Sequence, residues 1–118
     1  MRFLTALQIH GNSIQMESMI RASFQEFFSK NTLFQMNNKS QILHVANKAG
    51  LDEKLANDCF DKTQTEEIKE KLKKNSQNAV EIGAFGLPAT FVYPNENKKP
   101  VLFWGCDRNE YIAPLLNV

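Results

Sequence analysis

Apolar residues recur at three- and four-residue steps through the first two-thirds of the chain, the spacing that buries one face of a helix. The strongest pattern predicts a helix whose buried stripe consists of Met16, Met19, Ile20, Ser23, Phe24, Phe27 and Phe28. A second helix is predicted over residues 41–49, and its buried face would carry Ile42, Val45, Ala46 and Ala49. Gly50 followed by Leu51 is typical of a helix end that is closed by glycine.

Two further helices are predicted from their start signals. Asp52 offers a side-chain oxygen as the N-cap of a short helix that ends near Phe60. The segment Thr63-Gln64-Thr65-Glu66 has the spacing of a capping box and predicts a longer helix that runs to about Ile82. The inward-facing residues of this longer helix are expected to be Ile68, Leu72, Ala79 and Val80.

The residue pattern changes at Gly83 from helical to extended. Ala89–Tyr93 and Val101–Trp104 are rich in β-branched and aromatic residues, which favour strands. Residues 94–100 between them are polar and contain two prolines, as expected for a loop. The two runs therefore predict a β-hairpin.

A final helix is predicted after the hairpin. Asp107 and Glu110 have capping-box spacing, so Asp107 is expected to cap this helix. Pro114 falls within it and predicts a kink or an early end near Ile112, because proline removes a helical hydrogen bond. The predicted order is therefore helices, strand, strand, helix.

Composition narrows the function classes. A chain of 118 residues fits one compact domain, and 14 Lys and Arg against 13 Asp and Glu give a net charge of +1. This balance disfavours nucleic acid or an anionic membrane as the main partner. No apolar run is long enough for a membrane span, and residues 1–9 do not resemble a secretory signal. We expect an intracellular protein.

The residues that most often bind metals or form disulfides are few. Cys59 and Cys106 lie far apart and form no C-x-x-C motif, so free thiols are expected. His10 and His44 have no metal-site spacing and are expected at the surface or half-buried. The sequence therefore predicts no metal.

Two features near the C-terminus each have a structural and a ligand-binding interpretation. Pro88 is first interpreted as a proline that starts a strand. A cis Leu87–Pro88 bond would instead turn the Leu87 N–H and C=O outward, where an extended peptide pairs with them. Asp107 is first interpreted as a helix cap, and alternatively as the partner of a ligand ammonium beside a helix N-terminus that attracts a carboxylate. The residues alone favour the structural interpretations and leave the others open.

At these positions the sequence resembles a known family. Residues 83–90 (GAFGLPAT) and 102–108 (LFWGCDR) are similar to the C-terminal part of class kappa glutathione transferases and of their hydroxychromene-carboxylate isomerase relatives. Residues 1–6 (MRFLTA) and the segment from Ile42 to Gly50 resemble parts of the helical domain of that family. The resemblance extends over the whole chain.

The resemblance implies an α/β (α+β), mostly helical fold of the DsbA type. Residues 1–82 would form the helical insertion domain. Residues 83–118 would form the C-terminal strand-strand-helix half of a thioredoxin-like domain. The N-terminal strand-helix-strand half of that domain has no counterpart in this sequence.

The resemblance also implies a glutathione site. It implies a cis-Pro88, with the Leu87 main chain paired with the cysteinyl part of glutathione, and it places the glutamyl end against Cys106 and Asp107. Cys106 stands where the family commonly has serine or glutamine, so a mixed disulfide with glutathione is an alternative role for its thiol. Glutathione would be a co-substrate, and no metal is implied.

In the family, glutathione is conjugated to small electrophiles, and peroxide reduction is a further implied activity. A serine in an S-P-Y-S stretch hydrogen-bonds the glutathione sulfur there, and this sequence has no such stretch. The resemblance therefore implies no catalytic residue in this chain. The alternative is a non-catalytic glutathione-binding or oligomerisation module derived from the family.

The family further implies a homodimer for the full-length protein and a mitochondrial or peroxisomal location. No targeting signal is visible, since residues 1–9 are not a transit peptide and residues 116–118 are not S-K-L. The chain begins at a methionine that the family has internally. It is expected to be a short product or an incomplete gene model.

Overall fold

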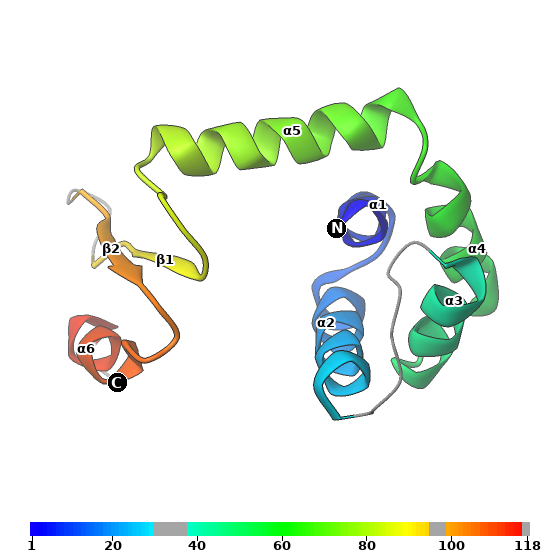
Figure 1. Cartoon of the computed structure of the whole chain (residues 1–118), viewed down its shortest axis with the longest axis horizontal. Helices are drawn as coiled ribbons and strands as arrows, with labels where there is room; N and C mark the ends of the chain where they lie inside the picture. Colours follow the sequence, from blue (N-terminus) through cyan, green and yellow to red (C-terminus); the bar gives the residue numbers. More distant parts are fainter. Residues whose placement is uncertain (30–37, 95–98, 117–118) are drawn as a thin grey trace. The chain divides into compact units, whose positions relative to one another are not determined.

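The structure, a computed structural model, describes residues 1–29, 38–94 and 99–116. Its elements, labelled in Figure 1, are α1 (Arg2–His10), α2 (Ser13–Ser29), α3 (Lys39–Lys48), α4 (Glu53–Lys62), α5 (Glu66–Glu81), β1 (Ala89–Val92), β2 (Val101–Trp104), α6 (Asn109–Ile112) and the short 3-10 helix η1 (Ala113–Leu116). This order confirms the predicted mostly helical α+β fold class. The described residues group into two compact units, unit 1 (residues 1–74) and unit 2 (residues 75–118). The predicted domain division after residue 82 stays a prediction.

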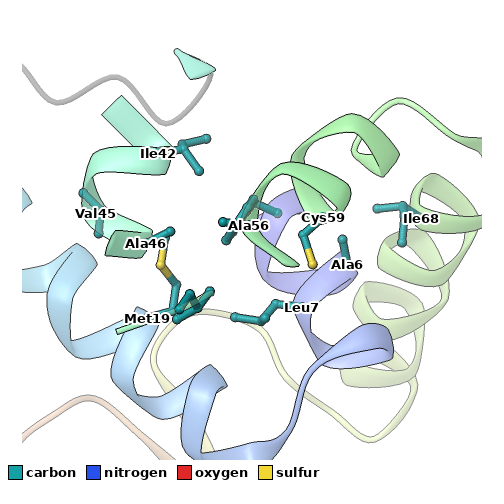
Figure 2. Close-up of a cluster of buried hydrophobic side chains, with 11 residues drawn as sticks. Ala6, Leu7, Met19, Ile42, Val45, Ala46, Ala56, Cys59 and Ile68 are labelled. Carbon is teal, nitrogen blue, oxygen red and sulfur yellow. The ribbon is translucent and has the colours of Figure 1, made fainter. Parts of the chain in front are cut away.

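Unit 1 is built around one hydrophobic core. Helix α1 contacts α2 and α4, and α3 contacts the same two helices. The buried cluster between them consists of Phe3, Ala6, Leu7, Met19, Ile42, Val45, Ala46, Leu51, Ala56, Cys59 and Ile68 (Figure 2). Leu7 and Met19 are among its largest fully buried side chains. The core therefore includes side chains from each of the first five helices.

Local hydrogen bonds explain where two of these helices end and begin. Helix α3 ends at Lys48 with Ala49 as its C-cap, and the predicted glycine stop follows at Gly50, whose φ of +74° favours glycine. The Leu51 N–H donates to the Ala46 carbonyl, which closes the helix end, and Leu51 is buried. The Leu55 N–H donates to the Asp52 carboxylate at 3.1 Å, so the predicted N-cap of α4 is confirmed.

The start of α2 carries a capping box that sequence reasoning missed. The Gln15 N–H donates to the Asn12 side chain at 2.9 Å, and the Asn12 N–H donates to the Gln15 side chain at 3.0 Å. The Asn-x-x-Gln spacing was the available signal.

Three predictions about the helices are wrong. The capping box at Thr63 does not form, because its hydroxyl donates to the Phe60 carbonyl at the end of α4 and α5 begins only at Glu66. Val80 is exposed rather than inward-facing, and among the described residues of α5 it is Ile68 that belongs to the core cluster. The predicted buried stripe of α2 is too wide: Met19 is buried, whereas Phe24, Phe27 and Phe28 are exposed.

Unit 2 contains the predicted hairpin. Strands β1 and β2 are antiparallel, with Ala89 opposite Trp104 and Val92 opposite Val101. The first strand ends at Val92, one residue earlier than predicted, and residues 95–98 of the predicted loop lie outside the described residues. Helix α6 ends at Ile112, which confirms the early end predicted from Pro114.

Candidate functional site

The four predicted site residues lie at one end of the hairpin. Leu87 and Pro88 immediately precede β1, and Cys106 and Asp107 follow β2. The Gly105 N–H donates to the Pro88 carbonyl at 3.0 Å, which brings the two segments together. All four predicted residues are exposed, and Leu87 is 86% exposed. The Leu87–Pro88 peptide bond is cis in this structure.

Two glycines around this end of the hairpin lie where an added Cβ atom would crowd a neighbouring side chain. Gly105 has a φ of +105°, and a Cβ atom there would lie 2.7 Å from the Asp107 carboxylate oxygen Oδ1. A Cβ atom at Gly86 would lie 2.6 Å from the Trp104 indole nitrogen Nε1. Both side chains therefore approach the backbone closely, and any larger residue would displace them.

Trp104 is the residue at this site that sequence reasoning missed. It was predicted only as a strand residue, but its indole covers Gly86 and lies beside Phe85, with ring centroids 5.5 Å apart. Both aromatic side chains are exposed. The available sequence signal was Gly86, which lies two residues before Pro88 in the segment that leads into β1.

Asp107 does not cap α6, so that prediction is wrong. The N-cap position is Arg108, without a side-chain hydrogen bond, and α6 begins at Asn109. The turn at Gly105 directs the Asp107 carboxylate back over that glycine and away from the first amides of the helix. Arg108 Nε lies 3.6 Å from Asp107 Oδ1, and both side chains are exposed. The carboxylate is therefore accessible to a ligand.

The two thiols differ in accessibility. Cys59 is fully buried in the core of unit 1, and this burial raises the pKa of its thiol, which makes it a poor nucleophile. Cys106 is exposed beside Asp107. A reaction with a thiol reagent or a disulfide is thus expected at Cys106.

Three further findings concern metal ligands, the two histidines and membrane-spanning helices. Among the described residues, no group of three or more His, Cys, Asp or Glu side chains is arranged to hold a metal ion. His10 and His44 are both exposed, as predicted. No helix within the described ranges is long and apolar enough to cross a membrane.

Comparison with known proteins places these features in a family. A model of the DSBA-like thioredoxin domain matches residues 1–117. Glutathione S-transferase kappa 1 of Rattus norvegicus is 33% identical over 116 residues, and that of Homo sapiens is 34% identical over the same length. Each comparison covers 98% of this chain and 49% of the relative, so the chain spans about half the length of these curated relatives. The predicted resemblance to kappa-class enzymes is confirmed, and the chain belongs to the family of DSBA-like thioredoxin domains.

Proposed function

We propose that these 118 residues carry part of the glutathione site of a class kappa glutathione transferase. The observation that supports this most strongly is the Gly105 N–H to Pro88 carbonyl bond, which holds two exposed segments at one end of the hairpin. The similarity to glutathione S-transferase kappa 1 from two mammals supports glutathione as the ligand.

In this proposal the two segments recognise different parts of the tripeptide. The exposed main chain of Leu87 pairs with the cysteinyl residue of glutathione, as an added strand would. The Asp107 carboxylate accepts hydrogen bonds from the ammonium of the glutamyl end, which is a charge-assisted pair. Cys106 lies beside this end as the alternative site of a mixed disulfide with glutathione. A small electrophile is the second substrate.

No residue of this chain is assigned to thiol activation. Glutathione reacts as its thiolate, so conjugation needs a donor that lowers the thiol pKa. Neither Phe85 nor Trp104, the two aromatic side chains beside Gly86, carries a charge that would lower the pKa of the glutathione thiol. We therefore expect the 118-residue chain by itself to bind glutathione and to catalyse little conjugation.

Calorimetric titration tests the binding claim. Reduced glutathione is expected to bind the folded chain, and Asp107→Ala is expected to weaken binding about tenfold or more through loss of a charge-assisted hydrogen bond. Leu87→Ala is the matched control, because it keeps the main chain and should change affinity little. An analogue with glutaryl in place of the glutamyl residue lacks the α-amine, so wild type and Asp107→Ala should bind it equally.

Two results would contradict this proposal. The first is a folded chain that does not bind glutathione. The second is an Asp107→Ala variant that still prefers glutathione over the analogue. Turnover of a chloronitrobenzene by the same chain would instead show that the chain itself carries a thiol-activating group.

The alternative function is a non-catalytic glutathione-binding or oligomerisation module. It is favoured if intact-mass measurement of the native protein gives 13.5 kDa, the mass of these 118 residues alone. A homodimer of the full-length protein and a mitochondrial or peroxisomal location stay predictions.

A further inference from the structure

We draw no further inference here: the strongest candidate, the apolar groove between α1 and α2 that is lined by Leu4, Ile20, Phe24, Phe27 and Phe28, carries none, because nothing in the described part of the structure shows what covers it.

Discussion

At the scale of single residues, Gly105 connects the backbone of the hairpin to the chemistry of the candidate site. Its φ of +105° is one that other residues adopt only at a cost of about 1–2 kcal/mol. A Cβ atom would also press on the Asp107 carboxylate at 2.7 Å. Gly105→Ala is therefore expected to lower the free energy of unfolding and, under the proposed function, to weaken glutathione binding.

Gly83 provides the matched control for this prediction. Its φ is +103°, almost the same value, but a Cβ atom there would meet no heavy atom within 4 Å. Gly83→Ala should therefore carry the conformational cost without displacing a carboxylate. Urea unfolding and glutathione titration of both variants separate the two effects. Equal losses of glutathione affinity in the two variants would show that the contact with Asp107 has no part in binding.

The same residues indicate how far sequence reasoning reached into the site. Leu87, Pro88, Cys106 and Asp107 were identified by resemblance, and the structure brings them to one end of the hairpin. The function of Asp107 as a helix cap was predicted wrongly, because its direction depends on the backbone turn at Gly105. A residue's φ angle is a property of the folded loop, and the D-R-N-E spacing does not contain it.

At the scale of elements, the predictions succeeded where one local hydrogen bond decides the outcome. The glycine stop after α3 and the N-cap before α4 could both be predicted, because Gly50 and the Asp52 side chain make hydrogen bonds only with neighbouring residues. The Thr63 capping box failed for a competing local bond, to Phe60. The end of α4 and the start of α5 could each use the Thr63 hydroxyl, and residue spacing does not show which of the two hydrogen bonds forms.

The α2 stripe failed for a different reason. Its apolar residues spread over the inner and outer faces, from Met19 in the core to Phe28 in solvent. Periodicity reports that apolar residues share a helix, but which of them are buried depends on where α1 and α3 pack. The exposed apolar face of α2 is therefore a finding of the structure that periodicity did not predict.

Asp52 gives a prediction at this scale. Its carboxylate accepts from the Leu55 N–H at the first turn of α4, so Asp52→Ala should lower the free energy of unfolding by about 1 kcal/mol. Asp107→Ala is the comparison, because Asp107 makes no helix cap and its removal should change stability by less than about 0.5 kcal/mol. Thermal or urea unfolding measures both. An equal loss in the two variants would show that the Asp52 bond has no capping value.

At the scale of the whole molecule, buried apolar surface is divided unequally between the two units. The core cluster draws its members from residues 3 to 68, all within unit 1. In the described part of unit 2, Val92 is the buried hydrophobic residue, while Trp104, Tyr93 and Leu87 are exposed. A two-stranded hairpin with little buried surface is marginally stable in water.

Amide hydrogen exchange should therefore separate the units. Amides of core residues such as Leu7 and Val45 are expected to exchange only through openings that cost on the order of 5 kcal/mol, near the global value for a small domain. Amides of β1 and β2, together with the Gly105 N–H, should exchange through openings close to zero, because few apolar contacts oppose them. Saturating glutathione should slow exchange in the hairpin and leave unit 1 unchanged, since the proposed ligand contacts only Leu87, Pro88, Cys106 and Asp107. Uniform protection across both units in the free chain would contradict the prediction, because it would require the hairpin to share the stability of the helical core.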